Sequence, residues 1–535
     1  MLIQFDPSGP RGASFWINIA EDMSILIVVP TTAFAVIGIS RMPSAAIHVL
    51  SLALCLSSGF QQGYIASVLN QPYAQIQKYI NSSWTHSMGE PVDATTMSFL
   101  WSTLNVCFPI ATIFGQLAAT FLVAKLGRKR TALISCFLYI PGTILSAAAK
   151  WIPNCYELLF VGRIIWSLAN GIASVNATVW IVECAPAAIR GRMAAMQEFF
   201  MAFGSLMTQA LGVPFSSEKW WDMNFIPNTI IVLINICLFF FVYESPQFLI
   251  EKHQNYDKAR RALSSYHGVP SDDPNVEYEI QTCDQAIQKK LEKKKLTSSG
   301  KQSSDLSSLT VMFNPIKAND PASQVIRQNA WVGLMVKIAY VFTGARCLRG
   351  YSAFVLEQLG GWGAFEANLC SLFVGFVRVP VTLVPVFLVD KLGRRPLILG
   401  SVAISFLAIC LMHLSIVMGA TWKWGTLIGL TILLLINACG IGSISRFYCA
   451  EVVPRSYLLQ SVSTLTQLEA VSKISVEFAF YPVAASIGAN SLLLFSLPSL
   501  ILLVFMWKLC PETSRKSVSE VLNETAKKKG FDVQF

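Results

Sequence analysis

Two short basic segments of the chain resemble each other, and each lies between two long apolar runs. The first reads LVAKLGRKR at residues 122–130, and the second reads LVDKLGRRPL at residues 388–397. The second copy begins 266 residues after the first, a period far longer than the repeat unit of a solenoid. Each copy is expected to be a turn that joins two membrane helices. Internal repeats of this size are typical of transporters, so we expect two similar membrane-spanning halves.

The composition supports a location in a bilayer. Of the 535 residues, 53% are hydrophobic and only 13% are charged, and the mean hydropathy is +0.52. A soluble protein with so few charges has too little polar surface to present to water. The formal net charge is +10, but the basic residues fall in short turns between apolar runs, which indicates membrane topology. We therefore expect contact with lipid and no nucleic-acid partner.

The cysteines, histidines and possible nucleophiles of the sequence give no sign of a catalytic or metal centre. The thirteen cysteines lie mostly in apolar segments, without CxxC spacing or a nearby histidine cluster, so neither a disulfide framework nor a metal site is expected. No cofactor is expected either. Since no nucleophile and base arrangement or phosphate loop occurs, the chain is not expected to be an enzyme.

The apolar runs predict an all-α polytopic membrane protein with two six-helix halves around a central cavity. Each run approaches the roughly 20 apolar residues that a spanning helix needs. The runs lie near 45–69, 97–123, 131–149, 156–182, 193–214 and 225–243 in the first half, and near 330–356, 367–389, 396–418, 425–449, 460–485 and 490–508 in the second.

Five regions follow from this pattern. They are a leader at 1–44, an N-terminal half at 45–243, a linker at 244–328, a C-terminal half at 329–509 and a tail at 510–535. The linker is basic, with the string KKLEKKK, and is expected to be partly helical. Within the leader, residues 23–39 are apolar but contain Pro30, so they fit either an interfacial helix or an extra span.

The basic turns predict the orientation in the membrane. Turns with several lysines and arginines follow the second and fourth runs, while the alternate turns hold few. The basic turns, and both ends of the twelve-helix core, should therefore be cytoplasmic. The sequon Asn81-Ser82-Ser83 then lies outside, where Asn81 can be glycosylated. The plasma membrane is the expected location, and the oligomeric state stays open.

Short motifs fall between the runs in a fixed order. They are Gly162-Arg163, Glu183-Cys184-Ala185-Pro186 with Arg190-Gly191-Arg192, Glu244-Ser245-Pro246, the two GR(K/R) turns, Ala450-Glu451 and Pro511-Glu512-Thr513. This set resembles the sugar-porter branch of the major facilitator superfamily, especially the animal facilitative glucose transporters, over about residues 45–515. The resemblance implies the major facilitator fold and transport of a small polar, hexose-like solute by alternating access.

The charged residues of these motifs are expected to form ion pairs that act as a gate. Carboxylates at membrane depth need cationic partners, and such pairs would hold one face closed and break as the halves move. The alternative is that the charges only fix the orientation. The predicted set is Arg128, Arg163, Glu183, Arg190, Glu244, Asp390, Arg394 and Glu451.

The resemblance also indicates substrate-binding positions, and here the sequence departs from the family. Asn70 and Gln209 keep the family's residue types, whereas the other positions carry Glu198, Tyr340, Arg346, Arg378 and Arg446 in place of neutral polar or aromatic residues. An isolated ionised side chain at the bilayer centre costs roughly 2.5–3.5 kcal/mol on insertion scales. The three arginines are therefore expected to face the cavity.

Two interpretations of these charges stay open. Glu469, Lys473 and Glu477 fall on one helical face, so the cations could belong to a closed ion-pair network. Alternatively, an excess of cations favours an anionic ligand, held by a clamp of Arg346 and Arg378. The charges weighed are Lys337, Arg346, Arg378, Arg446 and Lys473 against Glu198, Glu469 and Glu477. Gly344 and Gly350 should let the helix unwind beside Arg346.

Transport is expected to be facilitative. Proton-coupled members of the resembled family carry an aspartate after Gly63-Tyr64, where this chain has Ile65, and Glu198 is the residue that could replace it as a proton acceptor. Three classes of function remain: a hexose carrier by resemblance, a carrier of a small organic anion from the arginines, and a membrane receptor or sensor without transport.

Overall fold

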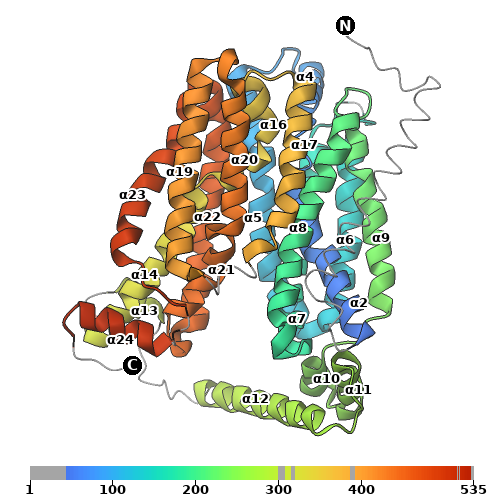
Figure 1. The fold of residues 1–535 in the computed structure, drawn as a ribbon. Helices are drawn as coiled ribbons and strands as arrows, with labels where there is room; N and C mark the ends of the chain where they lie inside the picture. The colour runs from blue at the N-terminus through green and yellow to red at the C-terminus, as the bar shows by residue number, and fades with distance from the viewer. Residues whose placement is uncertain are drawn as a thin grey trace.

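The computed structural model describes residues 44–152, 154–298, 308–314, 320–385, 392–514, 516 and 518–531. Over this part of the chain the regular structure is helical, without a β-strand (Figure 1). The apolar run at 23–39 and Asp390 lie outside the described residues, so the expectations for them stay predictions.

The first half begins at Ser44, whose hydroxyl caps the first helix by accepting from the Ile47 N–H. Its membrane helices are separated by tight turns. Gly127, with φ +90°, ends one helix and starts the next, a conformation that favours glycine. The elements are α2 (Ala45–Leu54), the π-helical η2 (Cys55–Phe60), α3 (Gln61–Ser67), α4 (Tyr73–Met88), α5 (Ala94–Leu126), α6 (Arg128–Ala148), α7 (Glu157–Cys184), α8 (Ala187–Phe215) and α9 (Ile226–Phe240).

The second half repeats this scheme with more interrupted helices. Gly393, with φ +88°, occupies the place that Gly127 has in the first half. The elements are α14 (Pro321–Phe342), α15 (Ala345–Gly350), α16 (Ser352–Phe354), the π-helical η4 (Val355–Leu359), α17 (Ala364–Val381), α19 (Arg394–Met418), α20 (Lys423–Cys439), α21 (Ile441–Val452), α22 (Arg455–Ile487) and α23 (Leu493–Leu509).

The polar segment between the halves contains four helices: α10 (Pro246–His253), α11 (Tyr256–His267), α12 (Pro274–Ser298) and α13 (Ser308–Phe313). Arg260 of α11 donates to the Glu277 carboxylate of α12 over 2.6 Å, and this hydrogen bond raises the pKa of the Arg260 guanidinium. In Figure 1, α10 to α12 and the tail helix α24 (Val518–Lys528) lie at the same end of the molecule.

The helices have the length and surface of membrane spans. Nine segments of the described chain are long and apolar enough to cross a bilayer, and Lys423–Cys439 is a shorter apolar helix. Large apolar side chains cover the outside, with Phe121 69% and Phe241 76% exposed. Such a surface is unfavourable in water and suits contact with lipid. Each expected apolar run coincides with a helix, and the count of twelve spans stays a prediction.

The two halves contact each other through α8 against α17 and α5 against α22. Hydrogen bonds also join them near α4 and α16, at the end of the molecule opposite α12 (Figure 1). There Asn70 donates to Ser352 Oγ over 2.8 Å, and Gln77 donates to Tyr481 Oη over 2.7 Å. These bonds hold the halves together at the α4 end.

Candidate functional site

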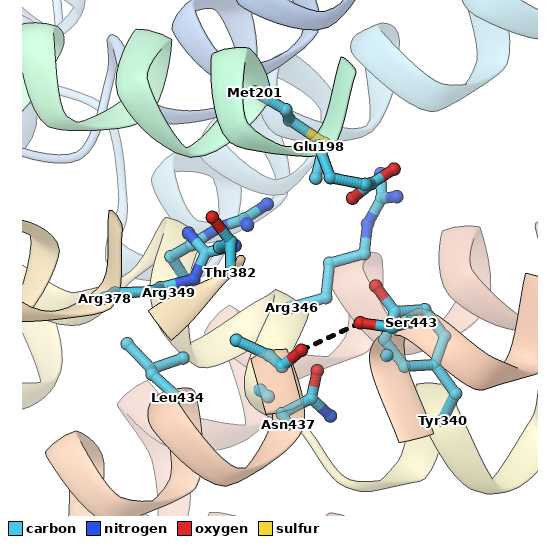
Figure 2. A pocket seen from close by; sticks show the side chains of 13 residues that line it. Glu198, Met201, Tyr340, Arg346, Arg349, Arg378, Thr382, Leu434, Asn437 and Ser443 are labelled. Carbon is cyan, nitrogen blue, oxygen red and sulfur yellow. Dashed lines mark hydrogen bonds between the residues drawn. The ribbon is translucent and has the colours of Figure 1, made fainter. Parts of the chain in front are cut away.

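A cavity with an empty volume of about 480 Å³ lies between the halves. The first half contributes Glu198 and Met201 from α8, and the second half contributes residues from α14, α15, α17, α20 and α21. Figure 2 shows Arg346, Arg349 and Arg378 extending into it. Two further cavities, of about 270 and 380 Å³, also have Arg349 in their walls. Arg349 is therefore common to all three cavities.

A break in the seventh expected span shapes this cavity. Helix α14 ends at Phe342 and α15 begins at Ala345, with Gly344 at φ +71° between them. A Cβ at Gly344 would lie 2.8 Å from the Phe495 ring, so both the backbone and the packing require glycine. The predicted break beside Arg346 is confirmed. An interrupted helix is tolerated at membrane depth where its backbone lines a cavity.

Arg346 belongs to an internal ion pair. Its Nε lies 2.6 Å from Glu477 Oε1, and the two side chains are 19% and 14% exposed. About two helical turns earlier on α22, Glu469 pairs with Lys337 over 2.7 Å and also with Lys473. The common face of Glu469, Lys473 and Glu477 does permit internal pairing, as expected. The predicted clamp of Arg346 with Arg378 needs correction, because Arg346 is already paired.

Arg349 and Arg378 line the cavity without an ion-pair partner among the described residues, unlike Arg346. Both are half-buried, both line the two cavities of about 480 and 270 Å³, and their like charges are close enough to interact. Neither has a hydrogen-bond or ion-pair partner within the described part of the chain. Arg349 was not among the site residues predicted from the sequence, although its i+3 spacing from Arg346 places both on one helical face.

The other predicted substrate positions are divided between the cavity and the contact of the halves. Tyr340 and Glu198 line the central cavity, and Gln209 lines the neighbouring one while donating to Ser371 Oγ over 3.3 Å. Asn70 instead bridges the halves, since its Oδ1 also accepts from the Ala353 N–H over 3.1 Å. Arg446 lies in α21, and its side chain is outside the described atoms.

The predicted gate residues of the first half form a cluster at the start of α6. Arg128 Nη2 lies 2.5 Å from Glu183 Oε1, and Ser245 Oγ donates to the same carboxylate. Glu244 accepts from the backbone N–H groups of Arg128 and Lys129, at 2.9 and 3.2 Å. Glu244 therefore caps the helix N-terminus, where a negative charge is favourable.

The second half has the matching cluster at the start of α19. Arg394 Nη2 lies 3.4 Å from Glu451 Oε1, and Thr513 Oγ1 donates to Glu451. Glu512 accepts from the backbone N–H groups of Arg394 and Arg395, at 2.9 and 3.0 Å. The capping role of Glu512 was missed, although its place matches that of Glu244. In the contacts that the structure describes, each cluster joins helices of one half.

The remaining predicted gate residues lie elsewhere. Arg163 was expected in an ion pair, and within the described part of the chain this is wrong. Its guanidinium, on α7, donates to the carbonyls of Leu104 on α5 and Ile65 on α3, at 2.8 and 3.1 Å. Arg163 also lines the cavity of about 380 Å³, together with Arg346 and Arg349. Arg190 lies in α8, and its side chain is not among those described.

Asn81 lies on α4, at the end of the molecule opposite the linker helices (Figure 1). Its Oδ1 accepts from the Val92 N–H over 2.9 Å. The sequon and the basic linker are therefore at opposite ends, as the predicted topology requires, and glycosylation stays a prediction.

The chain is similar to known sugar transporters over nearly its whole length. The family described as "Sugar (and other) transporter" matches residues 50–524. A facilitated glucose transporter homolog of Caenorhabditis elegans is 24% identical over 494 residues, covering 89% of this chain and 90% of the relative. The facilitated glucose transporter member 5 of Equus caballus is also 24% identical, over 88% of this chain and 91% of its own length.

The fold likewise matches solved transporters. The D-xylose-proton symporter superposes with a TM-score of 0.67 at 18% identity, covering 88% of this chain and 100% of the symporter. The xylose transporter XylE from E. coli, in an inward open conformation, gives a TM-score of 0.69 at 19% identity, over 89% of this chain and 99% of its own. The predicted major facilitator fold is confirmed, as is the expectation that the chain is not an enzyme. The chain is an integral, multi-pass membrane protein that belongs to the sugar transporter family.

Proposed function

We propose that the chain carries a small polar solute across the membrane by alternating access, without coupling to an ion gradient. The observation that carries the proposal is the central cavity, whose walls come from both halves. Hydrogen bonds between the halves near α4 and α16 close one end. Rocking of the halves about this cavity would expose it to each side of the membrane in turn.

Uncoupled transport follows from the residues near the cavity. Ile65, which is buried on α3, provides no carboxylate where a proton-coupled member would have one. Glu477 is held by Arg346 over 2.6 Å, so its carboxylate belongs to an internal ion pair. Glu198 on the cavity wall is the group through which proton coupling would have to act.

The solute is expected to be about the size of a hexose and hydroxylated. The relatives named above are facilitated glucose transporters, and the cavities offer neutral polar side chains that can bind hydroxyl groups. These are Gln209, Ser352, Ser371, Thr382, Asn437 and Ser443.

For the topology we propose the plasma membrane, with the linker and both ends of the twelve-helix core in the cytoplasm. The five regions predicted from the sequence keep their boundaries in this scheme. The proposal is supported by α12 and α24 lying at one end and α4, which carries Asn81, at the other (Figure 1). The clusters around Arg128 and Arg394 then lie at the cytoplasmic ends of α6 and α19, where they set the orientation and stabilise the turns.

Uptake of a labelled panel into proteoliposomes containing the full chain tests the proposal. D-glucose, D-fructose and D-glucuronate are each supplied outside, and the internal concentration should rise to the external one and stop. Accumulation above that level which a protonophore abolishes would contradict uncoupled transport, and Glu198→Gln would then be expected to remove the accumulation. Absence of saturable uptake for every solute in the panel would instead favour a receptor.

A further inference from the structure

The described walls of the cavities between the halves carry more positive than negative charge. Among the described residues that line them are Arg163, Arg346, Arg349 and Arg378 and the two carboxylates Glu198 and Glu477. Of the four guanidinium groups, Arg346 is paired with Glu477 and Arg163 donates to two carbonyls. Arg349 and Arg378 remain, without a hydrogen-bond or ion-pair partner among the described residues.

These two side chains occupy the same part of the cavity. Arg349 is on α15 directly after the Gly344 break, and Arg378 is in the last turn of α17. Figure 2 shows both beside Thr382, while Arg346 extends toward Glu198. Because the two helices belong to different parts of the second half, their packing is what brings the two like charges together.

An arrangement of this kind is unfavourable in the empty protein. Two partly buried guanidinium groups near each other repel, and each has lost part of its hydration. The neighbouring carboxylates offset this only in part: Glu477 attracts Arg349 but is in direct contact with Arg346, and Glu198 has an interaction with another residue. An anion that enters the cavity would remove the repulsion and satisfy both groups.

We propose that Arg349 and Arg378 together bind a carboxylate of the transported solute, which is therefore a hexose-sized hydroxylated organic anion. This inference rests on the proposed transport function and specifies its substrate class. A guanidinium presents a planar fork of donors that matches a carboxylate. The carboxylate would lie between the two arginines, and the hydroxyl groups would reach Thr382, Asn437 and Gln209.

The arrangement also explains why a neutral hexose is the poorer ligand. A hydroxyl group can accept hydrogen bonds from the two arginines but brings no charge to offset their repulsion. The loss of one charge-assisted hydrogen bond weakens the apparent affinity about 10- to 150-fold. D-glucuronate and D-glucose make a matched pair of probes, since they differ only in a carboxylate replacing the terminal CH₂OH group.

The experiment compares these two probes on full-length protein in proteoliposomes. The variants are Arg349→Gln, Arg378→Gln and the double variant, with Arg349→Lys as the charge-retaining change. Arg130→Gln is the matched control, since it removes an exposed arginine from a basic turn outside the cavity. Thermal unfolding in detergent reports on the fold, and losing an unpaired cation should leave the unfolding temperature unchanged or higher.

We expect wild type and Arg130→Gln to take up D-glucuronate with an apparent affinity at least 10-fold better than for D-glucose. Each glutamine variant should lose about 10- to 150-fold in affinity for D-glucuronate while its affinity for D-glucose changes little. Arg349→Lys should recover only part of the loss, because an ammonium cannot match the fork.

Other outcomes separate the two proposals. If wild type transports D-glucose but neither transports D-glucuronate nor is inhibited by it, the anion site is refuted and the transport function stands. If the glutamine variants unfold at clearly lower temperature than wild type, the arginines serve the fold and the inference is wrong. If neither probe enters through wild type or any variant, the proposed function fails along with its substrate class.

Discussion

The ion pair of Arg346 with Glu477 gives a sharp test of how the charged interior is held together. The two groups are 2.6 Å apart, and both are less than one-fifth exposed. Two unit charges about 4 Å apart attract by about 4 kcal/mol at an effective dielectric constant of about 20, but the loss of hydration opposes this attraction. Removing one partner leaves the other charge without its ion pair in a cavity wall that includes Phe108, and removing the second partner as well should then cost little more.

We expect Arg346→Gln and Glu477→Gln each to lower the free energy of unfolding by about 2–3 kcal/mol, somewhat less than for a fully buried pair. The double variant should be destabilised by about as much as either single one, which corresponds to a coupling energy of about 2–3 kcal/mol. The measurement is equilibrium unfolding of the purified full chain in mixed micelles, followed by tryptophan fluorescence.

A matched control comes from the pair of Lys78 with Glu218, which has a similar distance of 2.7 Å but side chains that are 70% and 71% exposed. Solvent screens such a pair, so Lys78→Gln should leave the unfolding curve unchanged within error. If the effects of Arg346→Gln and Glu477→Gln simply add in the double variant, to within about 0.5 kcal/mol, the two groups are not coupled and the reasoning is refuted.

Three further predictions concern the turns and the topology. Asn81→Gln should remove a glycan from protein made in animal cells, seen on a gel as loss of the shift caused by enzymatic deglycosylation; a wild type with no such shift would count against glycosylation at Asn81. Gly127→Ala should lower the unfolding temperature, because φ is +90° and the new Cβ would lie 2.7 Å from Glu244 Oε2; Gly419→Ala, at φ +77° with no atom within 4 Å, should have a smaller effect. Glu512→Gln should weaken the N-terminal cap of α19 by about 1 kcal/mol, and an effect as small as that of an exposed Glu→Gln change elsewhere would contradict the capping role.

Much of the architecture could be predicted from the sequence because the bilayer imposes it locally. Backbone groups in lipid must be paired within the same segment, so each long apolar run had to become a helix, and the structure has a helix at each. Each basic turn required the chain to reverse sharply after Leu126 and Leu392. The glycines that follow, Gly127 and Gly393, both adopt positive φ. The break beside Arg346 was predictable from Gly344, since glycine, as at Gly127 and Gly393, adopts a positive φ that other residues rarely adopt.

The pairing of the charges was decided only by the tertiary structure. A sequence shows that arginines are too costly to face lipid, but the partner of each one depends on how the helices cross. Glu477 meets Arg346 rather than Arg378 because α22 packs beside α15, and Arg163 finds carbonyls of α5 and α3 instead of a carboxylate. Arg349 had no distinguishing mark in the sequence beyond its spacing from Arg346. Contacts between segments distant in the chain determine which charges remain unpaired, and here they leave Arg349 and Arg378 together in the cavity.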